Sequence, residues 1–113
     1  MKSLGELIKA EREKRNWPQR ELAYQLDIDV SVLSRIEKEN KFPKKRLPDI
    51  IRKVSSIFQI PEDELKKAHL SDEIASLLLY ESTFQEILQA SEAKVQYGRQ
   101  KKSVQANLKF EDK

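Results

Sequence analysis

The sequence predicts an all-α protein, in which a compact bundle of five helices is followed by one long C-terminal helix. Apolar residues recur at helical spacing along almost the whole chain, and no stretch sustains the alternation typical of a β-strand. Hydrophobic residues make up 38% of the 113 residues and charged residues 36%. We therefore expect a modest core inside a strongly charged surface.

Three apolar stripes predict the first three helices. The first helix ends near Asn16, the second begins at Pro18 and Gln19, and the third covers about residues 29–38. Proline suits the start of a helix, because an N–H group at that position has no partner within the helix. The side chains predicted to face inward are, in chain order, Leu4, Leu7, Ile8, Leu22, Ala23, Leu26, Val32, Leu33 and Ile36.

The rest of the chain predicts three further helices. A basic link between Pro43 and Pro48 leads into a fourth helix, which ends at Phe58. The segment IPEDEL then opens a short fifth helix, whose acidic first turn suits the helix dipole. We predict a long sixth helix over residues 71–97, and a basic, flexible tail over residues 98–113, which lack sustained periodicity. The apolar stripe of the fourth helix consists of Ile50, Ile51, Val54 and Ile57.

Charge is divided unevenly between these segments. The net charge of the chain is +3, but residues 1–46 alone carry 12 Lys and Arg against 8 Asp and Glu. Residues 71–97 carry 1 against 5, and residues 98–113 carry 5 against 2. A polyanion is therefore the expected partner of the domain formed by residues 1–70, and the acidic helix that follows is expected to have a different task.

Several classes of function are disfavoured because the sequence lacks the residues or motifs that they need. The chain has no cysteine and one histidine, so we expect neither disulfides nor a metal site. This composition suits a reducing cytoplasm, where we expect the protein to act. No apolar run approaches the roughly 18 residues of a membrane span. We also expect no cofactor and no enzymatic activity, because no nucleophile with a neighbouring base and no phosphate-binding loop is visible.

The link between the second and third helices is the most informative part of the sequence. Only DID separates them, and so short a link makes two helices cross steeply, as in a helix-turn-helix. Asp27 tolerates the left-handed backbone that such a turn needs, and Asp29 is a good N-cap for the third helix. With its apolar stripe turned inward, the third helix presents small and cationic residues outward, namely Val30, Ser31, Ser34, Arg35 and Lys38.

Four pieces of the sequence carry a family resemblance through their order and spacing. They are LGELIKAEREKRN, PQRELAYQL, SVLSRIEKENKFP and LPDIIRKVSSIFQIPEDEL. With these pieces the chain resembles, from residue 4 to residue 65, the XRE family of phage-repressor and Cro-like helix-turn-helix proteins. The resemblance implies a compact, lambda-repressor-like DNA-binding bundle that takes double-stranded DNA as its partner, usually as a dimer.

The resemblance also implies roles for individual residues. It assigns base reading to Asp29, Val30, Ser31 and Arg35, and an arginine can bond both acceptors of a guanine. It assigns a structural bridge between the first helix and the end of the third to Arg12 and Glu37. Contacts with DNA phosphates are expected from Gln19, Ser34, Lys38, Asn40, Lys41, Lys44 and Lys45, with Arg46 as a further candidate.

The sequence departs from the family pattern at four positions. The family usually has glycine where this chain has Asp27 and Glu39. Pro18 replaces the usual Ser or Thr N-cap, and Glu11 replaces an apolar residue. These departures concern local geometry and the packing of the first helix, and they remove no group that is expected to contact DNA.

The predicted sixth helix carries an apolar stripe of its own. Glu81 and Ser91 interrupt this stripe, whereas Leu79 and Tyr80 lie off it, so the helix is apolar on more than one side. It can fold back on its own domain or bind another protein. We predict that it forms a homodimer, because its acidic character keeps it away from DNA. The residues predicted for dimerisation are Ile74, Leu77, Leu78, Phe84, Ile87 and Leu88.

The sequence therefore predicts a sequence-specific transcriptional regulator, a repressor or autoregulator that acts as a homodimer by occupying its DNA site. Three alternatives stay open. The chain could be the DNA-binding antitoxin of a toxin–antitoxin pair, with a toxin protein held by the sixth helix or the tail. It could also be the controller of a restriction–modification locus, or an interaction module whose helix-turn-helix no longer binds DNA.

Overall fold

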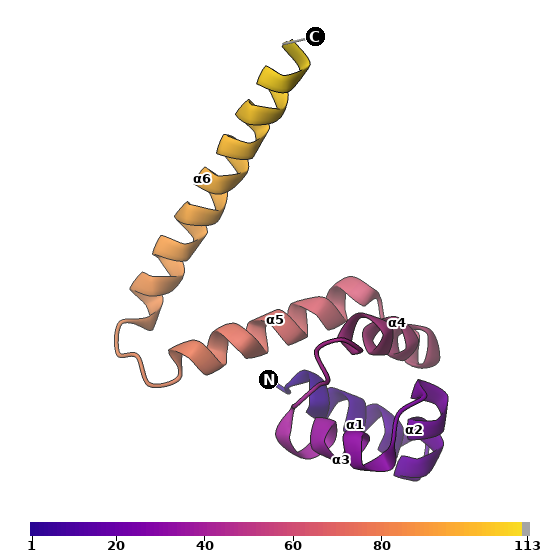
Figure 1. Cartoon of the computed structure of the whole chain (residues 1–113). Helices are drawn as coiled ribbons and strands as arrows, with labels where there is room; N and C mark the ends of the chain where they lie inside the picture. Colours follow the sequence, from indigo (N-terminus) through magenta and orange to yellow (C-terminus); the bar gives the residue numbers. More distant parts are fainter. Residues whose placement is uncertain (112–113) are drawn as a thin grey trace. The chain divides into compact units, whose positions relative to one another are not determined.

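A computed structural model describes residues 1–111 of the chain, and the side chains of residues 1–103 (Figure 1). Within these residues every regular element is a helix, as the sequence predicts. The helices are α1 (Leu4–Lys14), α2 (Gln19–Leu26), α3 (Val30–Glu39), α4 (Leu47–Phe58), α5 (Glu62–Leu78) and α6 (Phe84–Glu111). The chain divides into two compact units, Met1–Ser76 and the residues from Leu77 onward. No helix in the described part is both long and apolar enough to cross a membrane.

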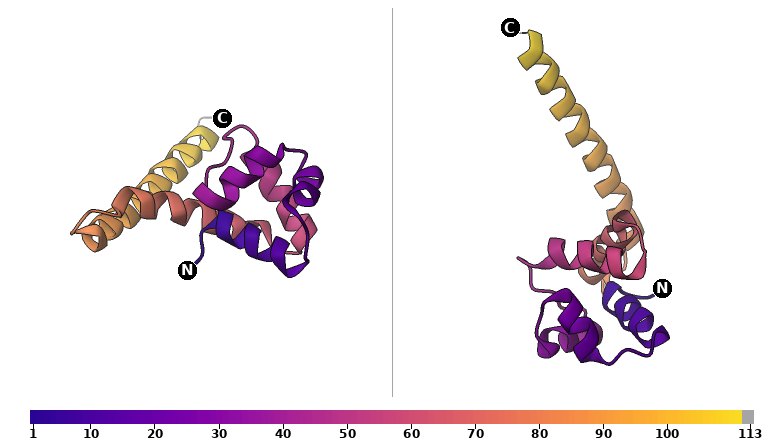
Figure 2. Two further views of the ribbon diagram at one scale, coloured as in Figure 1. Left: turned by 90° about the horizontal axis from the view of Figure 1, so that it is seen from below. Right: turned by 90° about the vertical axis from the view of Figure 1, so that its right-hand side faces the viewer.

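The core of the unit Met1–Ser76 is built from the apolar stripes that the sequence predicts. α3 packs against α1 and α2, and α2 contacts α4 (Figures 1 and 2). Val32, Leu7 and Ile57 are only partly buried and pack at the margin of this core. Because burial of one aliphatic side chain contributes about 1.5–3 kcal/mol, the core can hold this unit together. The buried hydrophobic residues are Leu4, Ile8, Leu22, Ala23, Leu26, Leu33, Ile36, Ile50, Ile51, Val54, Phe58 and Leu65.

The turns around α3 explain how the chain does without the usual glycines. Asp27, between α2 and α3, has φ 55° and ψ 50°, which is the predicted left-handed conformation. At the end of α3 the left-handed residue is Asn40, with φ 55° and ψ 35°. Glu39 is the last residue of α3 and is helical. Aspartate and asparagine are the non-glycine residues that tolerate this conformation best, so neither departure distorts the fold.

The helix starts of this unit are capped in different ways. α1 begins with a capping box, in which Glu6 N donates to Ser3 Oγ (3.1 Å) and Ser3 N donates to Glu6 Oε1 (3.4 Å). Pro18 precedes α2 without a side-chain cap, as predicted. Asp29 takes the N-cap position of α3, as predicted, although its side chain makes no capping hydrogen bond. The Asp29 side chain is exposed beside the first turn of α3.

Glu11, which stands where an apolar residue is usual, is held by neighbouring cations. Arg15 Nη1 donates to Glu11 Oε2 (3.0 Å) and Lys14 Nζ donates to Glu11 Oε1 (3.2 Å). The hydrogen bond from Arg15 lowers the pKa of Glu11 below its ordinary value. Arg15 also lies over the ring of Phe58, with Cζ 4.5 Å from the centroid, and the Trp17 ring lies 6.1 Å from the same ring. This cluster therefore closes the end of α1 against α4 with cation–π and aromatic contacts.

The second half of the chain differs from the prediction. α5 covers Glu62–Leu78, and after a break at residues 79–83 α6 covers Phe84–Glu111. The prediction of one helix over residues 71–97 is therefore wrong. The prediction that residues 98–113 lack helical structure is wrong for residues 98–111, and the last two residues lie outside the described ones. The predicted boundary after residue 70 lies inside α5.

The break before α6 has a physical reason that the sequence contains. Thr83 is a good N-cap, and Glu86 follows it at the spacing of a capping box. The first bond of the new helix is visible, because Ile87 N donates to Thr83 O (3.1 Å). Residues 99–111 include three Lys, two Gln and one each of Arg, Ala, Leu and Glu, and the high helix propensity of these nine residues outweighs one glycine.

Candidate nucleic-acid interface

The outward face of α3 carries the residues predicted to read DNA bases. Leu33 and Ile36 anchor the opposite face in the core, and neither has any exposed surface. Val30 is 45% exposed, and the side chains of Ser31 and Arg35 are exposed as well. Because residues four apart lie on one face of a helix, Ser31 and Arg35 stand one turn apart on the same side. Within the described part of the chain, the Arg35 side chain forms no ion pair.

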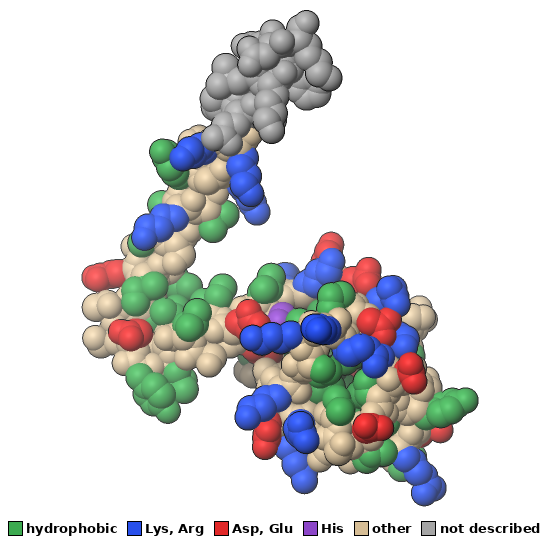
Figure 3. All heavy atoms as spheres, in the orientation of Figure 1, with side chains coloured by type: hydrophobic (Ala, Val, Ile, Leu, Met, Phe, Trp, Pro, Cys, Tyr) green, Lys and Arg blue, Asp and Glu red, His purple; other side chains and the backbone are tan. Residues whose placement is uncertain are grey.

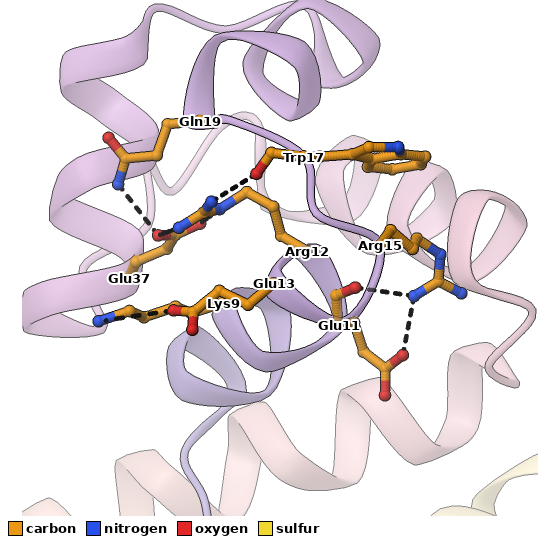
Figure 4. A network of polar contacts seen from close by, with 8 residues as sticks. All are labelled: Lys9, Glu11, Arg12, Glu13, Arg15, Trp17, Gln19 and Glu37. Carbon is orange, nitrogen blue, oxygen red and sulfur yellow. Dashed lines mark hydrogen bonds and ion pairs between the residues drawn. The ribbon is translucent and has the colours of Figure 1, made fainter.

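A buried ion pair joins α1 to α3, as the resemblance implies (Figure 4). Arg12 Nε donates to Glu37 Oε2 (2.8 Å) and Arg12 Nη2 donates to Glu37 Oε1 (2.9 Å), so the contact is bidentate. Arg12 Nη1 donates to the carbonyl oxygen of Trp17 (2.7 Å). The Glu37 side chain is 1% exposed and the Arg12 side chain 11% exposed. The pair therefore ties α1, the loop before α2 and the last turns of α3 together.

Both members of this ion pair stay charged. Burial alone raises the pKa of Glu37, but hydrogen bonds from Arg12 and Gln19 and the nearby charges of Arg12 and Lys9 outweigh burial and hold that pKa below its ordinary value. The hydrogen bond to Glu37 raises the pKa of Arg12. Loss of either partner would leave a buried charge without compensation, which is far more destabilising than loss of an exposed pair.

Gln19, predicted to contact a phosphate at the start of α2, belongs to the same network. Its Nε2 donates to Glu37 Oε1 (3.0 Å), and its side chain is partly buried. Figure 4 shows the amide nitrogen of Gln19 turned toward Glu37 and the amide oxygen turned away. The unpaired N–H groups of the first turn and the helix dipole make this end of α2 suitable for an anion. A phosphate bound there would therefore lie beside the Arg12–Glu37 bridge.

The basic segment, residues 38–46 at and after the end of α3, contains exposed side chains and side chains that form hydrogen bonds within the protein. Arg46 Nη2 donates to the carbonyl oxygen of Leu26 (3.2 Å) and to Asp49 Oδ2 (3.1 Å), so this arginine anchors the segment to α2 and α4. Ser34, on α3 itself, is partly buried. The lysines predicted to contact phosphates are all exposed, namely Lys38, Lys41, Lys44 and Lys45.

Asn40, which was also predicted to contact a phosphate, forms side-chain hydrogen bonds within the protein. Its Oδ1 accepts a hydrogen bond from Gly5 N (2.8 Å), and its Nδ2 donates to Asp72 Oδ2 (3.1 Å). The same Asp72 oxygen accepts a hydrogen bond from Leu4 N (2.8 Å). Both polar atoms of the Asn40 side chain therefore have partners within the protein, and a phosphate contact would have to use the second N–H of Nδ2.

The structural roles of Gly5 and Asp72 were not predicted from the sequence, and only that of Gly5 could have been. Glycine destabilises the interior of a helix by about 1 kcal/mol relative to alanine, so its presence indicates close packing. A Cβ atom on Gly5 would lie 2.0 Å from the carbonyl oxygen of Ile36, which means that the backbones of α1 and α3 touch. A lone aspartate on a long helix, such as Asp72, carries no comparable signal.

The residues predicted for dimerisation lie on two helices and not on one. Ile74, Leu77 and Leu78 belong to α5, whereas Phe84, Ile87 and Leu88 belong to α6. Leu78 and Ile87 are partly buried. Figure 3 shows hydrophobic side chains exposed on the start of α6. The exposed large hydrophobic residues from residue 70 onward, among those described, are Leu70, Ile74, Leu77, Leu79, Tyr80, Phe84, Leu88, Val95 and Tyr97, and we call them the apolar surface.

The packing of α1, α2 and α3, with a left-handed link at Asp27 and an outer face of α3 free of the core, defines a helix-turn-helix DNA-binding domain. Residues 5–69 match the family model described as a helix-turn-helix domain. This match covers more than half of the 113 residues, and the chain belongs to that family. Comparison with curated proteins and with solved structures gives no match. Membership of the family supports double-stranded DNA as the partner and transcription regulation as the role.

Proposed function

We propose that this protein is a sequence-specific transcriptional regulator of the XRE type, a repressor or autoregulator that binds duplex DNA as a homodimer. The observation that carries the proposal is the exposed Arg35 on a helix whose other face is fixed in the core. A side chain that reads bases must be free of intramolecular partners and must stand on a rigid element. Within the described part of the chain the Arg35 side chain has no hydrogen-bond or ion-pair partner, and α3 is anchored in the core by Leu33 and Ile36.

In the proposed complex, α3 enters the major groove with residues 29–35 nearest the bases. The guanidinium of Arg35 donates two hydrogen bonds to O6 and N7 of a guanine. Val30 packs against a thymine methyl group, and the short side chain of Ser31 lets the helix approach closely. The exposed carboxylate of Asp29 suits the amino group of a cytosine.

Contacts with phosphates position α3 in this groove without specifying the sequence. The exposed lysines at positions 38, 41, 44 and 45 supply them after the end of α3. The first turn of α2 supplies a further site through its free N–H groups, with Gln19 beside it. The Arg12–Glu37 bridge keeps α2 and α3 in the relative orientation that both sets of contacts need.

Dimerisation places two copies of α3 in successive major grooves, about 34 Å apart. The apolar surface on α5 and α6 supplies the contact between the two copies in this proposal. Residues 71–97 carry 1 basic residue against 5 acidic ones, so DNA repels this part of the chain and leaves it available for protein contact. Burial of each exposed leucine or isoleucine, such as Ile74 or Leu77, contributes about 1.5–3 kcal/mol.

Selection of preferred sites from a random duplex library tests the proposal. The whole chain should enrich an inverted repeat whose half-sites lie one helical turn, or a multiple of it, apart. Sedimentation of the protein with the enriched duplex should then give two copies of the chain per duplex. Failure to enrich any sequence would contradict sequence-specific binding. Enrichment of an isolated half-site that holds one copy would contradict the dimer.

A DNA-binding antitoxin is the second candidate, and the apolar surface is the observation that favours it. In that case a toxin protein, and not a second copy, covers α5 and α6. Sedimentation of the isolated chain separates the two candidates. A dimer whose association weakens on Leu77→Asp supports the homodimeric regulator, whereas a chain that stays monomeric leaves its surface for a different protein.

A further inference from the structure

Three helices of the N-terminal unit meet at the side chain of Asp72. One oxygen of this carboxylate, Oδ2, accepts hydrogen bonds from Leu4 N (2.8 Å), at the start of α1, and from Asn40 Nδ2 (3.1 Å), directly after α3. Asp72 itself lies on α5. The Asn40 side chain continues the network, because its Oδ1 accepts from Gly5 N (2.8 Å). The first turn of α1 and the end of α3 are therefore joined to α5 through two side chains.

Asn40 is suited to this network because of the backbone conformation that ends α3. It is left-handed, and the helix closes with hydrogen bonds from Asn40 N to Ile36 O (3.1 Å) and from Lys41 N to Arg35 O (3.4 Å). Glycine is the usual residue at such a helix end. Glycine would close α3 equally well, but it would lack the amide group that reaches α1 and α5. Asparagine combines both properties.

The contact between α1 and α3 leaves no room for independent movement at this point. A Cβ atom on Gly5 would lie 2.0 Å from the Ile36 carbonyl oxygen, so the two backbones are already in contact. A negative charge at the start of α1 is also favourable, because the helix dipole is positive there. The carboxylate of Asp72 thus stabilises the start of α1 and orients the amide of Asn40 at the same time.

We propose that Asp72 is a positioning residue for DNA binding, which acts through Asn40 to fix the end of α3 and the basic segment that leaves it. This inference rests on the proposed DNA-binding function. It gives a role in that function to a residue beyond the matched residues 5–69. The exposed lysines at positions 41, 44 and 45 follow Asn40 directly, so their placement depends on the direction in which the chain leaves α3.

The direction in which Asp72→Ala changes the affinity for DNA separates a positioning role from a simple effect of charge. Removal of an acidic side chain lowers the repulsion between protein and DNA, so charge alone would make binding tighter. If Asp72 positions the lysines, Asp72→Ala should bind more weakly in spite of its more favourable charge. Glu73→Ala is the matched control, because it removes the same charge from the next residue of α5. Glu73 is exposed, and among the residues whose side chains are described it pairs only with His69, at 3.1 Å.

The experiment measures the affinity of the whole chain and its variants for a labelled duplex of about 30 base pairs, which is long enough for two half-sites. The duplex carries the sequence that the wild type prefers, and circular dichroism verifies that each variant is folded at the temperature used. Asp72→Ala should weaken binding by about three- to tenfold, since a hydrogen bond to a charged group contributes on the order of one tenfold step in an equilibrium. Glu73→Ala should bind as tightly as the wild type or more tightly.

The salt dependence supplies a readout that a loss of stability alone would not move. The slope of log K against log salt falls by about 0.9 for each phosphate that the protein no longer neutralises. Asp72→Ala should therefore show a shallower slope than the wild type, and Glu73→Ala an unchanged one. Asp72→Asn keeps an oxygen that can accept a hydrogen bond, so it should recover part of the affinity.

A double-variant cycle tests whether Asp72 acts through Asn40. Asn40→Gly keeps the left-handed helix end and removes only the amide, so the double variant should bind little more weakly than Asp72→Ala alone. Fully additive losses would overturn the proposed route, and so would an Asp72→Ala variant that binds as tightly as the wild type with the same salt slope. Absence of duplex binding by the wild type would instead overturn the proposed function itself, and the positioning role with it.

Discussion

Arg12 holds the carboxylate of Glu37 through two parallel hydrogen bonds, of 2.8 and 2.9 Å, in the interior between α1 and α3. The two side chains belong to different helices, and the third hydrogen bond of Arg12, to the Trp17 carbonyl oxygen, reaches the loop before α2. The helix α3, which we propose reads DNA, is thus held at the turn that follows Arg35. This relationship makes the ion pair a link between the stability of the bundle and the orientation of the face of α3 that is proposed to read DNA.

The ion pair predicts a large loss of stability when one partner is removed. Arg12→Ala should lower the free energy of unfolding by about 3–5 kcal/mol, because the buried carboxylate of Glu37 then lacks a compensating charge. The exposed pair of Lys67 and Glu64, at 3.6 Å, is the control. Lys67→Ala should change the stability by less than about 1 kcal/mol. Urea unfolding measures both, and equal small losses for the two variants would contradict the role of the buried pair.

The ion pair also predicts a difference in stability toward acid. Burial raises the pKa of Glu37, but the hydrogen bonds from Arg12 and Gln19 outweigh it, so this pKa lies below its ordinary value of 4.5. The unfolded chain therefore takes up the proton at a higher pH than the folded protein does. The stabilisation by Glu37 is complete above the unfolded value and is lost as the pH falls through the lowered folded value.

Replacement of Glu37 by glutamine removes this titration. We expect the wild type to lose more unfolding free energy than Glu37→Gln as the pH falls below about 4.5. Glu11 and Asp49 also have lowered pKa values, but they titrate in both proteins, so the difference between the two curves reports on Glu37. Urea unfolding at a series of pH values provides the curves. Parallel curves would show that the pKa of Glu37 is not lowered by folding.

The apolar surface predicts that shortening the chain separates dimerisation from folding. Residues 1–76 include all the buried hydrophobic residues of the core, so a chain ending at residue 76 should fold as a monomer and bind DNA more weakly than the whole chain. A chain ending at residue 70 also loses Asp72, and it should melt at a lower temperature. Sedimentation and thermal melting of the two chains measure these properties. A dimer of undiminished strength in the shorter chains would place the dimer contact elsewhere.

The exposed lysines predict that the affinity for duplex DNA falls steeply as salt is added, through the release of counterions. Joint replacement of Lys44 and Lys45 by alanine should make the slope of log K against log salt shallower by about 0.9 for each phosphate that these lysines neutralise in the wild type. Joint replacement of Lys66 and Lys67 by alanine is the control, because it removes the same number of charges from exposed positions of α5. A slope that changes equally in both cases would mean that net charge, and not local contact, determines the salt effect.

The features that depend on local pattern could be predicted from the sequence. The stripes of α1 to α4 follow helical spacing, and the left-handed turn at Asp27 follows from the short link between α2 and α3. The bridge between Arg12 and Glu37 came from a family resemblance and could not have come from spacing, because 24 residues separate them. The outward position of Arg35 followed once the inward residues of α3 were known.

The features that the sequence did not reveal depend on competing local signals or on long-range contacts. The apolar residues of α5 and α6 continue at helical spacing across residues 79–83, and this pattern masked the helix start at Thr83. The pairing of Asp72 with Leu4 and Asn40 depends on how three helices pack, and no short stretch of sequence encodes that arrangement. For the same reason the engagement of Asn40 inside the protein could not be foreseen.

Sequence recognition depends, as we propose, on Arg35, which reads a base in the major groove. Removal of its two hydrogen bonds to guanine should lower discrimination at one base pair of each half-site by about 1–3 kcal/mol. Lysine keeps the charge but lacks the planar fork, so Arg35→Lys should restore affinity without restoring that preference. Non-specific affinity should fall in Arg35→Ala by little more than the removal of one phosphate-neutralising charge would explain.

Selection of preferred duplex sites for the wild type, Arg35→Ala and Arg35→Lys is the most direct test of this claim. We expect the wild type to require guanine at one position of each half-site, and both variants to accept other bases there while they keep the remaining positions. One preferred sequence shared by all three proteins, with guanine retained, would contradict it and would show that α3 recognises DNA without Arg35.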